Sequence, residues 1–352
     1  MKKKVLMIIP SFSAKGGITA VVDGYRNSEL ERDYEVKYIE TYCDGNKIKK
    51  IFKAFESYIK FFFRFLFWKP DIIHIHSSFG ASFSRKKPFI NFAFRFHKPI
   101  VNHIHGADFD SFYRNANDKT RKKIRTAYSK CNYIIALSDE WKANLSEIVD
   151  ENKIFVIENY GKLNEQAMAS RQEKKIDNNI LFLGFICERK GCYDIPSIAE
   201  KVISRIPDTK FVLAGSGEIE KIVSMSSEQV RKCLVFPGWV RNEKKDELLR
   251  QADVFFLPSY NEGMPMSILD AMGYGLPVVS TTVGGITKIV RNDINGYTFM
   301  PGDTDGMAAA LIKLLSDKNL NNIMGKKSVE IIVAGYSINQ HISKIEEVYG
   351  MV

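Results

Sequence analysis

Cysteine is scarce in this sequence, and the five cysteines follow no ligand pattern. Cys43, Cys131, Cys187, Cys192 and Cys233 are scattered and odd in number, whereas disulfide scaffolds and zinc sites need paired or closely spaced cysteines. No cluster of histidine and acidic residues with metal-ligand spacing is evident either. We therefore expect reduced thiols in a cytoplasmic protein that needs no metal and no other cofactor.

A signal peptide and a long uncharged apolar run are also missing. Met1-Lys-Lys-Lys leads directly into VLMIIP, which is too short for a secretory signal and lacks a small-residue cleavage site. The most aromatic stretch, Lys49–Lys69, carries too many charges to span a bilayer. From these absences we expect a protein that is not secreted and does not span a membrane.

Acidic residues are under-represented in the first half of the chain. Residues 1–170 hold 29 Lys+Arg against 19 Asp+Glu, and the remainder holds 22 of each, so the first half carries the whole net charge of +10. A basic half attracts nucleic acid, anionic lipid or phosphorylated substrates. Because no zinc finger, RNP-like aromatic motif or basic recognition helix accompanies this charge, we expect no nucleic-acid partner.

The 352 residues are enough for two domains, and short apolar runs alternate with helical stretches along both halves. This alternation predicts an α/β fold with doubly wound parallel sheets. The strand-like runs of the first half are Lys4–Pro10, Tyr34–Glu40, Asp71–Ile75, Pro99–Ile104, Asn132–Ala136 and Lys153–Ile157. Those of the second half are Ile180–Leu183, Lys210–Ala214, Leu234–Phe236, Val254–Leu257, Pro277–Ser280 and Tyr297–Phe299. The polar stretch Lys162–Asn178 between them is interpreted as a linker.

The stretch Pro258–Gly285, PSYNEGMPMSILDAMGYGLPVVSTTVGG, organises the second half. A buried strand is followed by a Gly/Pro-rich turn and then by a helix predicted over Met266–Gly273. Such a junction turns backbone N–H groups and the positive end of the helix dipole towards the loop, where a phosphate can bind. Glu262 and Asp270 are placed to accept hydrogen bonds from sugar hydroxyls beside it. The alternative is an ordinary strand–turn–helix with solvated acids.

This stretch resembles the E-x7-E signature of the retaining GT-B glycosyltransferases of family 4 (group 1). Their loop has the form P-S-x-x-E-G-x-P-x-x-x-x-E-A-M-A-x-G-x-P-V-V, followed by G-G. Two positions depart from the family pattern: the second acid is Asp270 rather than Glu, and Lys288 in GGITKIV stands where the family has Glu. The resemblance implies two Rossmann-like domains facing across a cleft: an acceptor domain, residues 1–165, and a donor domain, residues 176–335. It also implies that the C-terminal helix, residues 336–352, crosses back to the N-terminal domain.

The resemblance also implies roles for residues of the donor domain. Glu262 contacts the donor sugar, Asp270 the ribose, and the segment VFPGWV the nucleobase. In LFLGFICERKGCYDI, Lys190-Gly191 matches the family's G-R-x-x-x-x-K-G, but Phe185 replaces the Arg. We expect Arg189 and Lys190 to neutralise the leaving diphosphate; the alternative is a solvated basic loop. The remaining donor-binding residues implied are Gly215, Ser216, Trp239, Val240, Gly263, Met264, Met266 and Ser267.

Two elements of the first half carry the resemblance further. Gly16-Gly17 opens a helix after the first strand, like the family loop that approaches donor and acceptor, although a tight turn explains a lone glycine pair equally well. His105 in NHIHGADF follows a strand end that lines the crevice of an open α/β sheet, and the family's H-G histidine contacts the transferred sugar. Nearby His74, His76 and His103 are expected to fill the sheet.

The activity implied is retaining, metal-independent transfer of a sugar from a nucleotide-sugar, with UDP as the expected nucleotide, to a glycan acceptor. A polyprenyl-diphosphate-linked acceptor in bacterial capsule, O-antigen or exopolysaccharide synthesis fits the basic first half. The alternatives are a catalytically impaired GT-B homologue, suggested by Phe185 and Lys288, and a nucleotide-sugar 2-epimerase, which lacks the E-x7-E loop.

The stretch Lys49–Lys69 has a cationic face of Lys49, Lys53, Lys60 and Arg64 beside Phe, Ile, Leu and Trp. This pattern is typical of a helix at a membrane interface, and equally of a Rossmann helix with its apolar side on the sheet; the two are compatible. With the first interpretation, we expect a peripheral protein on the anionic inner face of the plasma membrane.

Overall fold

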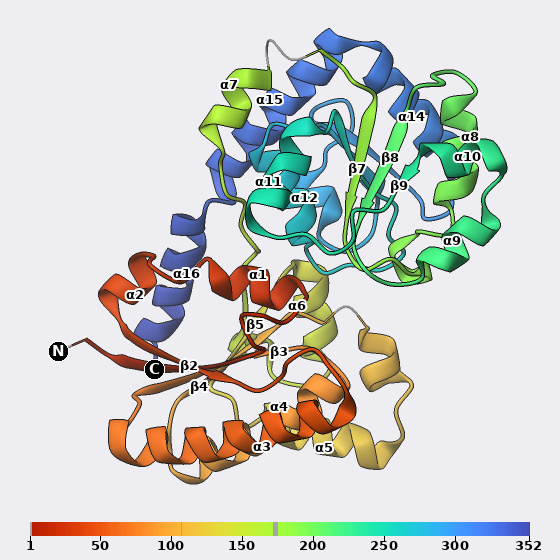
Figure 1. Ribbon diagram of the computed structural model, residues 1–352. Coiled ribbons are helices and arrows are strands. Elements are labelled where there is room, and N and C mark those ends of the chain that lie inside the picture. The colour runs from red at the N-terminus through yellow and green to blue at the C-terminus, as the bar shows by residue number, and fades with distance from the viewer. Residues whose placement is uncertain (1, 107, 172–174) are drawn as a thin grey trace. The chain divides into compact units, whose positions relative to one another are not determined.

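Both halves of the chain fold around a six-stranded parallel sheet (Figure 1). The computed structural model describes residues 2–106, 108–171 and 175–352. It divides into unit 1, Met1–Asn159 with Ile338–Val352, and unit 2, Tyr160–Ser337. The expected α/β class is thus confirmed, and so is the return of the C-terminal helix to the N-terminal sheet.

The sheet of unit 1 has the order β2-β1-β3-β4-β5-β6, with every pairing parallel. Each strand falls on a predicted strand-like run. The inner strands are buried because helices cover both faces of the sheet, whereas the edge strand β2, EVKYIE, mixes charged and apolar residues. The strands are β1 (Lys4–Ile9), β2 (Glu35–Glu40), β3 (Ile72–Ser77), β4 (Ile100–Ile104), β5 (Tyr133–Ala136) and β6 (Ile154–Val156).

Helices cover both faces of this sheet. In Figure 1, α1 (Gly17–Asp23), α2 (Glu29–Asp33) and α16 (Ile338–Gly350) lie on one face, and α3 (Lys47–Phe63), α4 (Ala81–Arg95) and α5 (Asp118–Tyr128) lie on the other. The helix α3 begins after Asn46, whose side chain accepts a hydrogen bond from the Lys49 amide, and passes into a π-helical turn, η1 (Arg64–Trp68). The remaining helices are η2 (Asp110–Arg114), α6 (Asp139–Ser146) and η3 (Glu151–Lys153).

The sheet of unit 2 has the order β12-β11-β10-β7-β8-β9 and is also parallel throughout. Its six strands again coincide with the predicted apolar runs. They are β7 (Asn179–Leu183), β8 (Lys210–Ala214), β9 (Leu234–Val235), β10 (Val254–Leu257), β11 (Val278–Thr281) and β12 (Gly296–Phe299).

The predicted helix after β10 is α12 (Met266–Gly273), with the bounds expected from the sequence. The other helices of unit 2 are α7 (Glu165–Arg171), η4 (Glu188–Lys190), α8 (Ile195–Ile203), α9 (Ile219–Met225), α10 (Glu228–Cys233), α11 (Asn242–Gln251), α13 (Ile286–Ile289), α14 (Thr304–Ser316) and α15 (Lys318–Gly335).

The stretch Lys162–Asn178 differs from the linker predicted for it. It contains α7, and the guanidinium of Arg171 donates to the backbone oxygens of Ala252 and Asp253, both at 3.0 Å. These bonds attach the stretch to unit 2 as a packed element. Residues 172–174 of the predicted linker lie outside the described residues.

Two further expectations concern the chain as a whole. All five cysteines are free thiols. Within the described ranges, no helix combines the length and the apolarity that crossing a bilayer requires.

Candidate functional site

The strand order of unit 2 places a topological switch point between β7 and β10. The chain runs from β7 through β8 to β9 on one side, and then returns to β10 on the other side of β7. In open α/β sheets, ligands bind beyond the carboxyl ends of the strands at such a point. Lys190 follows β7 and Glu262 follows β10, so the fold brings two predicted site residues to this position.

Glu262 and Lys190 form a buried ion pair. The Lys190 ammonium donates to the Glu262 carboxylate, which also accepts a hydrogen bond from the Ser259 hydroxyl at 2.7 Å. The two side chains are only 7% and 15% exposed. Neither residue is therefore a solvated surface charge, which was the alternative interpretation of both loops. Sequence reasoning missed Ser259 because a serine in a turn carries no distinctive signal.

The loops that carry this ion pair make close backbone contacts that require glycine. Gly191 ends η4 with a φ of 69°, and a Cβ on it would lie 1.8 Å from the Pro258 carbonyl oxygen. Gly284, after β11, has a φ of 55°, and a Cβ there would lie 2.0 Å from the Glu262 carbonyl oxygen. Only glycine permits both the left-handed conformation and this contact. The Gly-Gly pair of the motif thus packs against the backbone of the loop that carries Glu262.

The amide groups expected to hold phosphate lie at the start of α12. Pro265 precedes this helix without giving it a side-chain cap, so its first N–H groups keep the anion-binding character of a helix N-terminus. Gly263, Met264 and Met266 are buried and Ser267 is partly exposed.

Asp270 lies on α12 and makes its own ion pair. Its carboxylate accepts from the Lys245 ammonium of α11 at 3.0 Å, and its side chain is 14% exposed. The two acids of the signature thus have different cations, Lys190 and Lys245. Lys245 was missed because one lysine among the charges of RNEKKDELLR cannot be singled out by pattern.

The other predicted donor-site residues lie along the same edge of the sheet. Gly215 follows β8, and a Cβ on it would lie 1.8 Å from the Gly184 oxygen; the Ser216 carbonyl accepts from the Ile186 amide at 2.9 Å. These contacts join the loops after β7 and β8. Trp239, which is half-buried, and Val240, which is buried, follow the edge strand β9 and lie farther from the Lys190–Glu262 pair in strand order.

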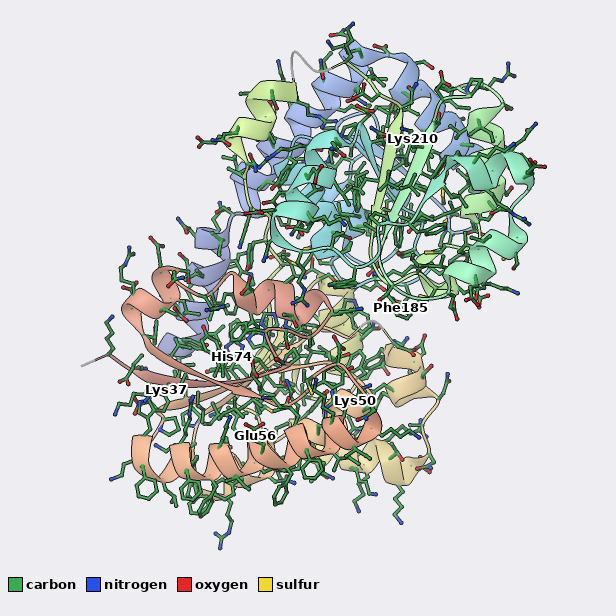
Figure 2. The ribbon with its side chains drawn as sticks, in the orientation of Figure 1. Lys37, Lys50, Glu56, His74, Phe185 and Lys210 are labelled. Carbon is green, nitrogen blue, oxygen red and sulfur yellow. The ribbon has the colours of Figure 1, made fainter. Side chains whose placement is uncertain are left out.

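Arg189 is attached to the signature loop by its guanidinium, which donates to the Asn261 oxygen at 2.9 Å. Its own carbonyl accepts from the Tyr260 amide at 2.9 Å. Phe185, at the position of the family's arginine, is 51% exposed and is labelled at the edge of unit 2 in Figure 2. That Arg189 replaces the missing cation stays a prediction.

His105 stands beside a stack of buried imidazoles in unit 1. Its Nε2 lies 3.0 Å from Nδ1 of His76, and its ring stacks on His103 with centroids 4.2 Å apart. His74, labelled in Figure 2, stacks on His76 at 4.3 Å and hydrogen-bonds to the Tyr349 hydroxyl of α16. His74, His76 and His103 fill the sheet, as predicted. Sequence reasoning did not foresee that His76 bonds directly to His105.

Burial keeps these imidazoles neutral. It lowers the pKa of His74 to about 3, and the pKa of His76, His103 and His105 well below the usual value, with neighbouring histidines acting in the same direction. Nitrogens of His74, His76 and His103 lie within 4.8 Å of one another, but the ring planes are only 6–34° apart. Lone pairs in nearly parallel planes do not converge on one ion, so we interpret the group as a stack rather than a chelate.

After His105, Asp108 and Asp110 stand at D-x-D spacing. Asp110 is exposed, and its carboxylate pairs with Arg114 at 2.8 Å. That carboxylate is therefore already neutralised by a cation.

Gly16 and Gly17 line a cavity of about 190 Å³ in unit 1. It lies near the carboxyl ends of β1, β2 and β3 and includes Lys15 and Arg85. A Cβ on either glycine would meet no atom within 4 Å, so the glycines keep this space open. The switch point of the unit 1 sheet, between β1 and β3, lies at the same place.

Comparison with known proteins agrees with this geometry. The family described as "Glycosyl transferases group 1" matches residues 177–317, and "Glycosyltransferase Family 4" matches residues 17–160. A UDP-Gal:alpha-D-GlcNAc-diphosphoundecaprenol alpha-1,3-galactosyltransferase from Escherichia coli is 30% identical over 337 residues, covering 91% of this chain and 84% of the relative.

Solved structures show the same fold at low sequence identity. A sucrose-phosphate synthase from Thermosynechococcus elongatus has a TM-score of 0.79 at 16% identity, with 99% of each chain covered. The Anabaena protein HepE, in complex with UDP, has a TM-score of 0.73 at 13% identity, covering 99% of this chain and 100% of the other. The chain therefore belongs to glycosyltransferase family 4, the group 1 glycosyl transferases, and is a glycosyltransferase of the GT-B type.

Proposed function

We propose that this enzyme is a retaining, metal-independent hexosyltransferase that uses a UDP-sugar and a glycan acceptor carried on a polyprenyl diphosphate. The buried Lys190–Glu262 pair at the switch point is the observation that carries the proposal. The name of the Escherichia coli relative gives UDP-galactose as donor and a diphosphoundecaprenol-linked sugar as acceptor. We therefore rank galactose first, in the assembly of a surface polysaccharide such as capsule, O-antigen or exopolysaccharide.

In this proposal the protein supplies charge and orientation. As the bond to UDP breaks, negative charge develops on the diphosphate, and the ammonium of Lys190, the guanidinium of Arg189 and the amides of α12 stabilise it. Glu262 accepts from hydroxyls of the sugar and Asp270 from the ribose. His105, held by His76, orients the transferred group. The acceptor hydroxyl then enters on the face that UDP leaves.

The ion pair of Glu262 gives this scheme a physical basis. Without a donor, Lys190 offsets the cost of burying the carboxylate. A bound diphosphate competes for the same ammonium and frees oxygens of Glu262 for the sugar. In this proposal the site is already organised when the donor binds, and cations of the protein take the place of a metal.

The acceptor side of the proposal rests on unit 1. Lys15 and Arg85 line its cavity and offer two cations to an anionic acceptor. We propose that the enzyme works in the cytoplasm, as a peripheral protein at the anionic inner face of the plasma membrane.

A transfer assay tests the proposal. Radiolabelled UDP-galactose, UDP-glucose and UDP-N-acetylglucosamine are each supplied with a short-chain lipid diphosphate carrying GlcNAc, and proton NMR gives the anomeric configuration of the product. We expect an α-linked galactose. A β-linked product would refute retention.

The same assay separates the alternatives. UDP binding without transfer or hydrolysis would indicate an impaired homologue, for which Phe185 and Lys288 would be the first residues to restore. Conversion of the donor sugar without any acceptor would indicate an epimerase.

A further inference from the structure

The helix α3 and the turn η1 expose a continuous apolar stripe. The residues recur at intervals of one, three and four along the chain, which places them on one side of the helix. In Figure 2, aromatic side chains project from α3 on the side turned away from the sheet. The stripe, here called the α3 surface, consists of Ile48, Ile51, Phe52, Phe55, Ile59, Phe62, Phe63, Leu66 and Phe67, which are 42–79% exposed.

The core of unit 1 does not need this stripe. The inward side of α3 and η1 already packs through Phe61 and Phe65, which are buried. Their rings lie 5.0 Å from those of Phe89 and Phe92 on α4, respectively. The Rossmann-helix interpretation of this segment is therefore confirmed for one side of the helix, and the membrane-interface interpretation stays a prediction for the exposed side.

Its neighbour α4 extends the apolar area. Phe94 and Phe96 are each 50% exposed, and Phe92 contacts the stripe through Phe62, with ring centroids 6.1 Å apart. Contiguous exposed apolar patches of this kind mark interaction surfaces.

The charge near the α3 surface is mainly positive, although Glu40 of β2 pairs with Lys53. Glu56 is the only acid among residues 47–69, which hold seven Lys and Arg, and residues 81–98 hold no acid and, besides the buried Lys86, four Lys and Arg. Glu56 itself is paired with Lys53 and Lys60. The aromatic stripe is thus flanked by net positive charge.

We propose that the α3 surface inserts into the interface of an anionic lipid bilayer and holds unit 1 there. Cationic flanks attract anionic headgroups, and the aromatic side chains enter the acyl boundary. A second copy of this chain fits less well, because a two-fold interface would set one cationic rim against its identical counterpart. The inference deepens the proposed function, since it places the acceptor domain where a polyprenyl-linked acceptor lies.

In this proposal apolar insertion makes the main contribution to lipid binding, because two of the cations expected at the membrane contact the sheet instead. Lys53 is 20% exposed and pairs with Glu40 of β2 at 2.9 Å, and Arg64 donates to the Tyr38 oxygen at 3.1 Å. These cations attach α3 to the sheet. Charge reversal at Lys53 or Arg64 would disturb the fold, so it is not a clean test of lipid binding.

Vesicle co-sedimentation tests the inference with the full chain. The vesicles contain phosphatidylethanolamine and phosphatidylglycerol. The test variant replaces Phe52, Phe55 and Phe67 with Ser, and the control variant replaces Met300, Ile323 and Val333 with Ser, which are exposed apolar residues of unit 2. We expect the vesicle partition coefficient to fall about tenfold or more in the test variant and to change less than about twofold in the control.

Salt separates insertion from pure charge attraction. Raising NaCl from about 0.1 to about 1 M shortens the Debye length from about 10 to about 3 Å. We expect part of the wild-type binding to persist at high salt. Complete release at high salt, or unchanged binding by the test variant at low salt, would overturn the proposal. So would a wild-type dimer by light scattering that the test variant abolishes while vesicle binding is absent.

Transfer assays keep this inference distinct from the proposed function. The test variant should match wild-type kcat/KM on a water-soluble short-chain acceptor, and lose activity on a vesicle-embedded one. A protein that binds vesicles through the α3 surface but transfers nothing would refute the proposed function alone. Normal transfer in a protein that never binds vesicles would refute the inference alone.

Discussion

Acid should unfold unit 1 well before unit 2, because unit 1 contains every histidine of the chain and unit 2, residues 160–337, contains none. Burial lowers the pKa of His74 to about 3 and that of His341 to about 4. A lowered pKa means that the unfolded state binds protons first. The stability from the neutral rings is therefore complete above pH 6.5 and is lost as pH falls towards 3–4.

The loss of stability at low pH can be calculated from the same pKa shifts. With a pKa of about 6.5 in the unfolded state, each buried neutral histidine lowers the free energy of unfolding by about 2 kcal/mol at pH 5 relative to neutral pH. His74 and His341 together cost about 4 kcal/mol by this relation, and His76, His103 and His105 act in the same direction. Since a domain is stable by about 5–15 kcal/mol in total, unit 1 should be at or near its midpoint by pH 5.

Urea titration read by peptide-level hydrogen exchange reports both units of the intact chain. Between pH 7.5 and 5, we expect the urea midpoint to fall steeply for peptides of unit 1 and only slightly for peptides of unit 2. His341→Gln should make the pH dependence of unit 1 shallower by about 1.4 kcal/mol per pH unit between pH 5 and 6. The matched control is His97→Gln, because His97 is exposed. Equal shifts in both units, or an unchanged midpoint in unit 1, would refute the reasoning.

Four shorter predictions concern the proposed site. Lys190→Ala should destabilise unit 2 by about 3–5 kcal/mol because it leaves Glu262 buried without its cation. The double variant Lys190→Met with Glu262→Gln should recover the urea midpoint but not the transfer activity. A Lys190→Ala variant as stable as the wild type would contradict the buried ion pair. Asp270→Asn should lower the affinity for UDP about tenfold in calorimetry, and Lys245→Met should lower it less. An unchanged affinity for UDP would show that Asp270 is not part of the nucleotide site. His105→Ala should lower kcat/KM by more than about tenfold, or about 1.4 kcal/mol, with an unchanged circular dichroism spectrum; smaller losses count against its role. Activity should survive EDTA, and a loss restored by Mn²⁺ or Mg²⁺ would overturn metal independence.

Elements that depend on local sequence were predictable here. The twelve strands of the described residues lie on strand-like runs that were visible in the sequence, and α12 has the expected bounds. The reason is that a buried parallel strand is mostly apolar, and that the Gly/Pro turn before α12 marks the start of this helix. Motif spacing likewise singled out Lys190 and Glu262, which the fold brings together as an ion pair; their role in binding the donor stays a prediction.

Pairings across the sheet could not be predicted in the same way. Lys245 meets Asp270, and His76 meets His105, only because strands and helices distant in sequence become neighbours. The orientation of α3 was also undetermined, since a helix that is apolar on several sides does not reveal which side is buried. The helix α7 was missed because its polar sequence, EQAMASR, resembles a linker.

The position of α16 has a consequence for how the protein is made. His341 hydrogen-bonds to Tyr25 and to the Glu158 carbonyl, and Tyr349 to His74, so the last helix completes one face of the N-terminal sheet. A ribosome adding about 5–20 residues per second needs roughly 10–40 s to synthesise the chain beyond Asn159. During that time α1 and α2 are already present on this face, but the part that α16 covers stays exposed while the intervening Rossmann unit is free to fold. Truncation that removes α16 should therefore destabilise the N-terminal sheet, because it removes the hydrogen-bond partners of Tyr25 and His74.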